Sequence, residues 1–520
     1  MHRFVATTIG CKVNQYDTES VSALLGRLGL DRLSADGSDS VTPADLVVVN
    51  TCCVTAAAAA KSRRAVRRAV KRHPNAGVVI LGCSVTRNAE ALRRAALQAG
   101  ATGPIYLAGH DEDVAACVRD CVARLAGDAE EQRTEQPSGL LERHRSGASG
   151  RGETPSPAGP VVDDRWMRAG SSPLRHDQVP SAAGVSTSMT PSERARVKGN
   201  IASALPSIRS FAGHQRAFVK VQDGCDALCS YCIVPYVRRR LWWRPIAEVV
   251  REVETLVGHG HREVVLCGVF LGAYGRETTA AQGRPPSPTL PELLANVAAV
   301  DGLWRVRLSS LHPGDVTDEL LAVLADRPTV APHLHLPLQS GSARILRRMN
   351  RRYGPDDFLS AVDMLRRAVD RPAITTDVLV GFPGETDSDF DRTLQVAREV
   401  GFARTHIFRF SPRPGTAAWA WRSDAPTGEV VNGRCGQLAD LQRRWARNFR
   451  ARFLGDTVEV LVEQGNAATP PGCHRGLTDR YLEVTFPRTE PGEGLIGQVV
   501  PVRVTEVSDA GLRGDCQFLQ

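Results

Sequence analysis

The stretch Gly224-Cys225-Asp226-Ala227-Leu228-Cys229-Ser230-Tyr231-Cys232 decides how the rest of the chain can be interpreted. Three residues separate its first two cysteines, and two residues separate the second from the third. Three thiolates at this spacing can each bind one iron of a cubane [4Fe–4S] cluster, because such clusters are held by cysteine thiolates. A cluster with three protein ligands keeps its fourth iron open, and a substrate or cofactor can coordinate that iron.

A zinc site and buried apolar cysteines are the alternative interpretations of this stretch. Zinc sites normally show two separated pairs of ligands, and no second pair follows here at a zinc-like distance. Cysteines of a hydrophobic core have no reason to keep this spacing between polar residues and beside a glycine. We therefore expect an iron–sulfur cluster on Cys225, Cys229 and Cys232.

The overall composition is that of an ordinary soluble protein, with 42% hydrophobic and 23% charged residues. The 520 residues are too many for one hydrophobic core and predict about two to four domains. No apolar run approaches the ~20 residues of a membrane helix, and residues 1–11 lack the long apolar stretch of a signal peptide. We expect a cytoplasmic protein without membrane association. In that compartment the 13 cysteines indicate metal or redox chemistry, and the net charge of +8 favours a polyanionic partner.

Residues 1–128 alternate short apolar runs with helical stretches, which predicts a small α/β domain with a parallel sheet. The expected strands are 4–8, 46–49 and 77–81, and a cysteine follows each within a few residues: Cys11, Cys52 and Cys83. Loops after the carboxyl ends of parallel strands converge on one crevice, so these cysteines can meet and hold a second cluster. The pattern fits ordinary small loop residues equally well.

Two further segments have a biased composition. Residues 61–72 carry seven basic and no acidic side chains at helical spacing, which favours RNA contact over a plain solvated face. Residues 129–213 are rich in Ser, Gly, Pro, Ala and Arg. Such a segment cannot bury enough apolar surface to offset its conformational entropy, and we expect a largely disordered linker.

Residues 214–448 are predicted to form βα units with right-handed parallel crossovers. The expected strands are 217–221, 263–266, 304–308, 333–336, 374–380 and 405–410. Six units are too few for an eight-stranded TIM barrel, so we expect a partial (βα)6 barrel with its site at the carboxyl ends of the strands. The three-cysteine stretch follows the first of these strands.

Residues 452–520 predict a small antiparallel β-barrel, with alternating strands at 458–463, 481–486 and 500–505. Small barrels of this type often bind RNA, and a plain capping domain is the alternative. Together the three folded parts make an α/β multidomain protein.

These residues resemble a known family. The cysteine motif, with Tyr231 before its last cysteine, is similar to that of the radical S-adenosylmethionine (SAM) superfamily. Its surroundings resemble the methylthiotransferases within that superfamily, and the C-terminal part resembles their TRAM module. The stretches that carry the resemblance are 10–19, 50–55, 82–83, 219–236, 268–275, 307–310, 333–342, 376–385 and 476–481.

The resemblance implies two [4Fe–4S] clusters and SAM. The implied ligands of the radical SAM cluster are Cys225, Cys229 and Cys232. The implied ligands of an auxiliary cluster are Cys11, Cys52 and Cys83, while Cys53 falls on a variable position. The residues that we expect to bind the cofactor are Tyr231, Gly268, Ser310 and Asp377. No catalytic side chain beyond the cluster ligands is assigned.

The implied reaction is methylthiolation of a tRNA base. Within the family, stretches 10–19, 50–55 and 268–275 most resemble the enzymes acting on N6-threonylcarbamoyladenosine at position 37, beside the anticodon. One SAM would donate a methyl group to sulfur, and another would supply the radical that removes the C2 hydrogen of the adenine. The partners implied are the tRNA anticodon stem-loop, a reducing electron donor and a sulfur donor.

Three alternatives remain open at this point. The family also contains enzymes that act on N6-isopentenyladenosine of tRNA and on a ribosomal-protein aspartate. An iron–sulfur RNA-binding protein without turnover is the alternative outside enzymes.

Several other residues lie in stretches that could contribute to the site. His333 and His335 are interpreted as a satisfied pair inside the barrel, because no acid or thiol lies near them in the sequence. Asp377 and Glu385 are candidates for hydrogen bonds to cofactor or substrate. Trp242 and Trp243, beside four arginines, suit either base stacking or the cover of an apolar edge.

Overall fold

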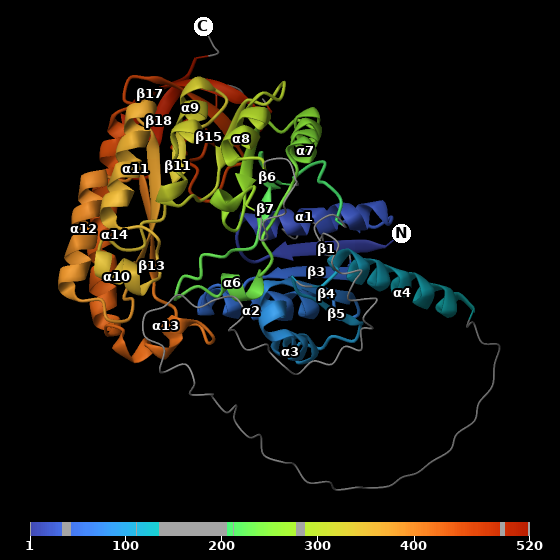
Figure 1. The fold of residues 1–520 in the computed structure, drawn as a ribbon. Coiled ribbons are helices and arrows are strands. Elements are labelled where there is room, and N and C mark those ends of the chain that lie inside the picture. Colours follow the sequence, from blue (N-terminus) through green and yellow to red (C-terminus); the bar gives the residue numbers. More distant parts are fainter. Residues whose placement is uncertain are drawn as a thin grey trace. The chain divides into compact units, whose positions relative to one another are not determined.

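The computed structural model describes residues 2–33, 43–110, 112–134, 205–211, 213–276, 287–488 and 494–517. Residues 1–125 and 201–520 form one compact unit, which carries all the elements discussed below (Figure 1). Most of the predicted linker, 129–213, lies outside the described residues. At its two ends the structure differs from the prediction, because helix α4 (Val114–Thr134) continues into it and Ile208 and Phe211 are buried in a hydrophobic core.

The N-terminal domain is a five-stranded parallel sheet in the order β2-β1-β3-β4-β5, with helices on both faces. Its strands are β1 (Arg3–Thr8), β2 (Asp31–Arg32), β3 (Leu46–Thr51), β4 (Gly77–Gly82) and β5 (Ile105–Ala108). Its other helices are α1 (Lys12–Arg27), α2 (Ala56–Arg72) and α3 (Cys83–Leu97). Helices α1 and α4 pack on one face, and α2 and α3 pack on the other. The central strands β3 and β4 are therefore buried on both faces, which explains their unbroken apolar sequences.

The central domain has the six predicted strands in a partial barrel. They are β6 (Arg216–Lys220), β9 (Glu263–Cys267), β10 (Arg305–Leu308), β11 (His333–His335), β12 (Ala373–Val380) and β13 (Arg404–Arg409). Parallel ladders join β6-β9-β10 and β11-β12-β13, and single bridges join Val306 to Val330 and Ser310 to His335. The strands thus form one continuous curved layer, as expected for a (βα)6 barrel.

Helices connect these strands. The longer ones are α7 (Ile246–Gly258), α8 (Leu290–Ala298), α9 (Asp318–Asp326), α11 (Pro355–Ala368), α12 (Asp387–Val400) and α14 (Gly428–Ala451). Short helices are α6 (Val234–Val237), α10 (Ala343–Arg348) and α13 (Ala417–Ala420), and a small hairpin pairs β7 (Gln222–Asp223) with β8 (Trp242–Trp243). Threonine or serine hydroxyls cap the first turns of α8, α9, α10, α12 and α14.

The C-terminal domain is a closed five-stranded barrel in the order β14-β15-β16-β18-β17. Its strands are β14 (Thr457–Glu463), β15 (Cys473–Leu477), β16 (Glu483–Pro487), β17 (Val499–Val507) and β18 (Leu512–Cys516). The sequence did not predict β15 and β18, each of which contains a glycine: Gly476 is the fourth residue of β15, and Gly514 is the centre of β18. A Cβ on Gly476 would lie 2.2 Å from the Leu461 carbonyl oxygen, so close strand packing requires glycine there. The pairing of β16 with β18 is parallel, unlike the antiparallel barrel that we expected.

The loop from β15 to β16 closes the amino end of the central barrel. Arg307 donates a hydrogen bond to the Thr478 carbonyl (2.6 Å), and its guanidinium lies 3.7 Å from the centre of the Tyr481 ring. Glu263 is fully buried there and accepts hydrogen bonds from Arg307 (2.6 Å) and Arg305 (3.1 Å). The stretch that most resembles a TRAM module is therefore engaged inside the protein.

Helix α1 holds the N-terminal domain against the central domain. The Tyr16 hydroxyl donates to Glu252 (3.0 Å), and Arg238 donates to the Asn14 side chain (2.9 Å). Both contacts are buried. They bring the loops that carry the N-terminal cysteines to the loop that carries the central cysteines.

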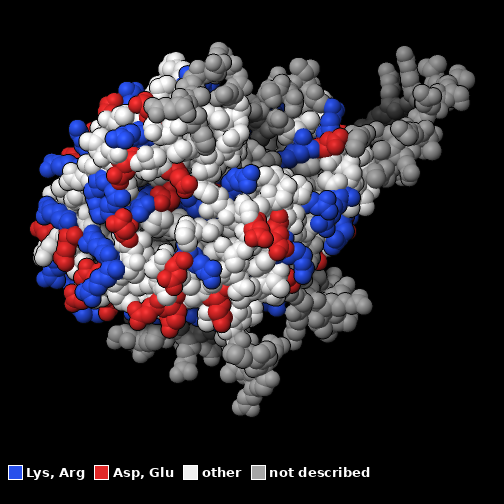
Figure 2. Space-filling view, turned by 90° about the horizontal axis from the view of Figure 1, so that it is seen from above, with Lys and Arg blue, Asp and Glu red and all other residues white. Residues whose placement is uncertain are grey.

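The surface charges on one face are mixed. Figure 2 shows Lys and Arg side chains interspersed with Asp and Glu on the face seen from above Figure 1. Among the described residues, no helix is long and apolar enough to cross a membrane.

Candidate functional site

The three central cysteines lie in the loop after β7, near the carboxyl end of the barrel. Cys229 is buried and Cys225 and Cys232 are half-buried, next to Phe270 and Leu241. Burial raises the pKa of the Cys225 thiol to about 12, and it also raises the pKa of Cys232. Thiols in so dry an environment become thiolates when a bound cation compensates their charge.

Arg351 is the cationic side chain nearest to this group. Its guanidinium donates a hydrogen bond to Cys229 Sγ (3.1 Å), and the Ala227 amide donates to Cys225 Sγ (3.5 Å). Both donors stabilise the ionised form of a sulfur ligand.

The backbone of the loop is built to turn tightly. Gly224 has φ +81°, and a Cβ there would lie 2.0 Å from the Arg240 carbonyl oxygen. Leu228 also has a positive φ (+47°), and its carbonyl accepts a hydrogen bond from the Asn350 side chain (2.9 Å). The glycine that precedes Cys225 in the motif is therefore required by the close approach of the two chain segments.

The N-terminal cysteines follow the carboxyl ends of three strands, as predicted. Cys11 follows β1, Cys52 follows β3 and Cys83 follows β4. A Cβ on Gly10 would lie 3.2 Å from the Cys52 Cβ, so the first two loops touch. The Ser84 hydroxyl donates to the Cys52 carbonyl (2.8 Å), which joins the second and third loops.

Burial affects these thiols unequally. Cys52 and Cys83 are buried, whereas Cys11 is exposed. Burial raises the pKa of Cys83 to about 12, and burial with the nearby Cys11 thiol raises the pKa of Cys52.

His110 is a member of this site that the sequence did not reveal. It lies just after β5, at the same sheet edge as the cysteines, and its Nε2 is 3.3 Å from Cys83 Sγ. Burial, with the charge of Arg238, lowers the pKa of His110 to about 3, so the ring is neutral. Prediction of β5 as a further strand of the sheet would have pointed to this residue, because His110 follows that strand at the same sheet edge as the cysteines.

The spacing of the thiols separates a cluster from a single zinc ion. Four sulfur atoms around one zinc lie about 4 Å apart, because the Zn–S bond is ~2.3 Å. In the described part of the chain, the one group of three potential ligands with all atoms within 4.8 Å contains no cysteine. Neither cysteine group therefore has all three of its Sγ atoms within 4.8 Å of one another.

The segments that carry the two cysteine groups pack against each other. Cys83 packs in a hydrophobic cluster with Ile233 and Val237, the segment that directly follows Cys232. Arg238, whose side chain is 3% exposed, forms an ion pair with Asp223 (2.7 Å) in the same region. Burial alone would lower the pKa of Arg238, but the nearby Asp223 and Cys83 raise it well above its usual value. Arg238 is therefore charged.

The predicted cofactor residues line the same end of the barrel. Tyr231 packs edge-on against Phe382, with ring centres 6.4 Å apart. A Cβ on Gly268 would lie 2.8 Å from the Gln222 side chain, so a larger residue would clash there. Ser310 is exposed just beyond β10, next to His335 of β11.

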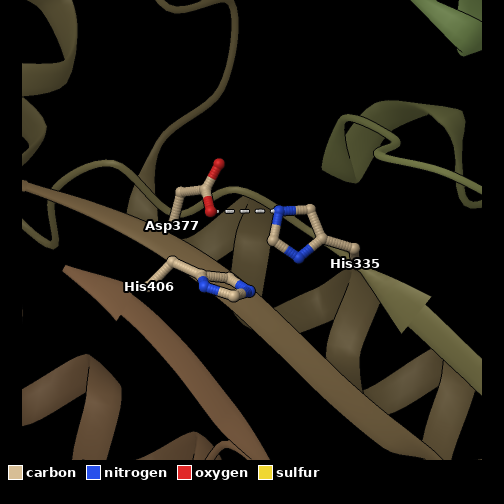
Figure 3. Close-up of side chains that lie close together, drawn as sticks. All are labelled: His335, Asp377 and His406. Carbon is tan, nitrogen blue, oxygen red and sulfur yellow. Dashed lines mark ion pairs between the residues drawn. The ribbon is translucent and has the colours of Figure 1, made fainter. Parts of the chain in front are cut away.

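Asp377, the fourth predicted residue, belongs to a polar cluster on the barrel strands (Figure 3). His335, Asp377 and His406 come from β11, β12 and β13, and their ligand atoms lie within 4.8 Å of one another. We call them the His–Asp–His cluster. The expectation that no acid lies near His335 is wrong, because its Nε2 is 3.2 Å from Asp377 Oδ1. Strand pairing, which the sequence does not show, brings the two together.

His333 is buried inside the barrel but is not fully satisfied as we expected, because its Nδ1 has no hydrogen-bond partner among the described residues. Its Nε2 lies 3.0 Å from the Thr375 hydroxyl, which is also 2.9 Å from His335 Nδ1. Glu385 accepts hydrogen bonds from the Gly381 amide (2.8 Å) and from Arg434 (2.7 Å), so it fixes a turn of the barrel.

The segment after the central cysteines is mostly structural. Trp243 packs against the barrel core and lies 5.7 Å from the Tyr274 ring, which matches the cover of an apolar edge. Arg238 and Arg244 are buried in ion pairs with Asp223 and Glu252. Two of the four arginines beside Trp242 and Trp243 are thus internal.

The remaining cysteines have no shared site. Cys121 is buried, and Cys117 packs against the same core under α4. Cys53 is buried, and its thiol donates to the Cys83 carbonyl (3.3 Å). The other four are Cys267, Cys435, Cys473 and Cys516.

Comparison with known proteins covers all three domains. Residues 219–397 match the Radical SAM superfamily, residues 3–101 match the uncharacterized protein family UPF0004, and residues 451–516 match the TRAM domain. The threonylcarbamoyladenosine tRNA methylthiotransferase MtaB of Chlamydia pneumoniae is 33% identical over 98% of this chain and 97% of its own. The chain belongs to the radical SAM methylthiotransferase family.

Other relatives show that the family includes more than one substrate. MtaB of Bacillus subtilis (strain 168) is 30% identical over 96% of this chain and 92% of its own. The tRNA-2-methylthio-N(6)-dimethylallyladenosine synthase of Desulfitobacterium hafniense (strain Y51) is 29% identical over 99% and 97%. Membership in the family implies a [4Fe–4S] cluster and SAM, and the thiol donors and spacing described above fit the cluster.

Proposed function

We propose that this enzyme adds a methylthio group to C2 of N6-threonylcarbamoyladenosine at position 37 of tRNA. The observation that carries the proposal is the contact between the loops of the two cysteine groups, where Cys83 packs against Ile233 and Val237. Radical formation and sulfur transfer must both reach one carbon atom, and this contact puts both groups at one barrel end. The MtaB relatives, aligned over nearly the whole chain, supply the identity of the base.

Two cofactor groups follow from this proposal. Cys225, Cys229 and Cys232 would hold the radical SAM cluster, and Cys11, Cys52 and Cys83 would hold an auxiliary [4Fe–4S] cluster. When bound, the first group with SAM supplies a radical that removes hydrogen, and the second supplies the sulfur. An aromatic C–H is not acidic enough for a side-chain base, so acid–base catalysis would not suffice.

The protein's own residues would position these groups and exclude water. Arg351 donates to Cys229 Sγ and so stabilises the ligand in its ionised form. Phe270 and Leu241 form apolar walls around the central thiols. Tyr231, Gly268, Ser310 and Asp377 remain the residues that we expect at the cofactor site, and one oxygen of Asp377 faces His335.

Contact with the tRNA anticodon stem-loop is proposed for the side of the N-terminal domain. Arg64, Arg67 and Arg68 of α2 are exposed, while Val66 and Val70 on the same helix are buried. Beside α2, a cavity of about 570 Å³ is lined by three arginines, Arg63, Arg87 and Arg413, and reaches Cys53. Basic side chains around a cavity suit RNA phosphates. The C-terminal barrel would add RNA contacts from its free surface.

A complete reaction needs a reducing electron donor and a sulfur donor, and a cytoplasmic location would give access to both and to tRNA. Enzymes acting on N6-isopentenyladenosine or on a ribosomal-protein aspartate, and a non-catalytic RNA-binding protein, are the competing functions. The relative named as a dimethylallyladenosine synthase makes N6-isopentenyladenosine the first competing substrate to test.

The test is an anaerobic assay with anticodon stem-loops that differ only at position 37. Three RNAs carry threonylcarbamoyladenosine, dimethylallyladenosine or plain adenosine, and mass spectrometry of the nucleosides measures the methylthio product. We expect product from the threonylcarbamoyl RNA at a kcat/KM at least tenfold above that of the other two. Preference for the dimethylallyl RNA would overturn the substrate, and absence of SAM cleavage with every RNA would overturn the enzyme.

A further inference from the structure

The His–Asp–His cluster lies inside the barrel next to the candidate cofactor site. Asp377 is in the middle of β12, and Leu379, two residues later, packs against Tyr231 beside the central cysteines. Thr375, two residues earlier, contacts His333. Residues two apart on a strand share a face, so Asp377 lies on the inner face between these two neighbours.

Thr375 links the two histidines of β11. Its hydroxyl lies 3.0 Å from His333 Nε2 and 2.9 Å from His335 Nδ1, so it can donate to one ring and accept from the other. When it donates to His335 Nδ1, the neutral ring carries its proton on Nε2, which faces Asp377 Oδ1 at 3.2 Å. The other oxygen of Asp377 can then accept a hydrogen bond from a ligand.

The cluster is partly accessible, which distinguishes it from the buried charges elsewhere in the barrel. The side chains of His335 and Asp377 are 14% and 25% exposed, and His406 is also partly exposed. The His406 ring lies 5.8 Å from the His335 ring and is tilted by 58° to it (Figure 3). Its nitrogen atoms are available to a ligand that approaches Asp377.

Lys12 brings a positive charge to the same place from the N-terminal domain. It follows Cys11 and is the first residue of α1, and it is half-buried. Burial first, then the charges of Arg404 and other neighbours including Lys12, lower the pKa of His406. With one carboxylate already engaged, the surroundings of the cluster favour an anionic ligand.

The two candidate bases differ in the chemistry that such a cluster can recognise. The threonylcarbamoyl group carries a carboxylate and a hydroxyl beyond the adenine ring, whereas the dimethylallyl group is a hydrocarbon. A hydrocarbon that covered these polar groups would leave them without hydrogen-bond partners, which is unfavourable.

We propose that His335, Asp377, His406 and Lys12 form the subsite for the threonyl group of the substrate base. Lys12 and His406 bind its carboxylate, and Asp377 accepts a hydrogen bond from its hydroxyl. This inference rests on the proposed function and assigns the residues that select that base over an apolar one.

A bound divalent cation is the competing interpretation, since two imidazoles and a carboxylate are a known ligand set. The positive charges of Lys12 and Arg404 disfavour a cation here, and with the Thr375 hydroxyl donating to Nδ1, His335 Nε2 faces Asp377 with its proton rather than with a lone pair. The structure therefore favours the anion.

The test compares His406→Phe and Lys12→Met with the wild-type holoenzyme on the threonylcarbamoyl and dimethylallyl stem-loops. We expect kcat/KM for the threonylcarbamoyl RNA to fall about ten- to a hundredfold in each variant. The ratio of kcat/KM for the two RNAs should fall by a similar factor, and His406→Gln, which keeps a donor, should recover part of it. Iron and sulfide content checks that Lys12→Met leaves the neighbouring Cys11 site loaded. His259→Phe, on the exposed end of α7, is the matched control and should keep the wild-type ratio.

Three results would overturn the subsite. An equal loss on both RNAs would show a role in folding or SAM binding, and an unchanged ratio would show no role in selection. Stoichiometric zinc or manganese that His406→Phe removes would show a metal site. These results are distinct from a failure of the proposed function, which would show as a wild-type enzyme that prefers dimethylallyl RNA.

Discussion

The two ends of the central barrel are both rich in buried polar groups, but they satisfy them differently. At the amino end, Glu263 is paired with Arg305 and Arg307, and Arg307 also binds the loop that carries Tyr481. Every partner in that network comes from the protein. At the carboxyl end, burial raises the pKa values of the Cys225 and Cys232 thiols, although the charge of Arg351 partly opposes this effect.

The comparison teaches how burial can be assigned to stability or to function. Paired charges at the amino end close the barrel and attach the C-terminal domain. Buried thiols at the carboxyl end ionise when a bound cation compensates their charge, so this end is expected to carry the chemistry. Three changes test this division, two at the carboxyl end and one at the amino end.

The largest effect is expected from Cys229→Ala at the carboxyl end. It removes the most buried ligand of the radical SAM cluster, so SAM cleavage should fall to background. Iron per chain should fall from about eight atoms to about four, because the proposed auxiliary cluster would keep its own three ligands. Anaerobic iron and sulfide analysis and the yield of 5′-deoxyadenosine measure both results.

Cys435→Ala is the control for this change, since Cys435 lies on α14 away from both cysteine groups. It should keep both the iron content and SAM cleavage. A single zinc per wild-type chain, without sulfide, would contradict the assignment of both groups.

A smaller effect on stability is expected from Glu263→Gln at the amino end. The change leaves Arg305 and Arg307 buried without their carboxylate, which should lower the free energy of unfolding by about 3–5 kcal/mol. Urea unfolding measures the loss. Glu506→Gln breaks an exposed pair with Arg513 and should cost less than about 1 kcal/mol. Equal losses in the two variants would mean that the amino-end network does not stabilise the barrel.

The smallest effect concerns pH and His312, at the carboxyl end. Its ring lies 4.3 Å from the Phe270 ring, and burial, with Arg351 and Arg276 nearby, lowers its pKa to about 3. The unfolded chain has a histidine pKa of about 6.5, so it takes up the proton first as the pH falls. Stability is therefore complete above pH ~6.5 and declines below it, by about 1–2 kcal/mol between pH 7 and 5 from this residue.

His312→Gln checks this contribution. The variant should lose less stability than the wild type between pH 7 and 5, measured by urea unfolding of the cluster-free protein at each pH. His259→Gln, at an exposed histidine, should follow the wild type. A wild-type and a His312→Gln protein with the same pH dependence would contradict a neutral His312 in the fold.

Much of the fold could be predicted because its signals are local. The six barrel strands and three strands of the N-terminal sheet are short apolar runs, and each lies within about two residues of its predicted position. Strands β15 and β18 were missed because they are short and each contains a glycine, and only pairing with their neighbours makes them strands. The placement of cysteines after strands was equally visible.

The sequence by itself determined the number, type and spacing of the sulfur ligands, because these follow from chain order and from strands that end where apolar runs end. The tertiary structure alone decided which other groups meet them: His110 beside Cys83, His335 against Asp377, and Tyr481 in the amino end of the barrel. Each of these contacts joins residues at least 27 positions apart. Such contacts depend on strand pairing and domain packing, which bring distant residues together without leaving a periodic pattern in the sequence.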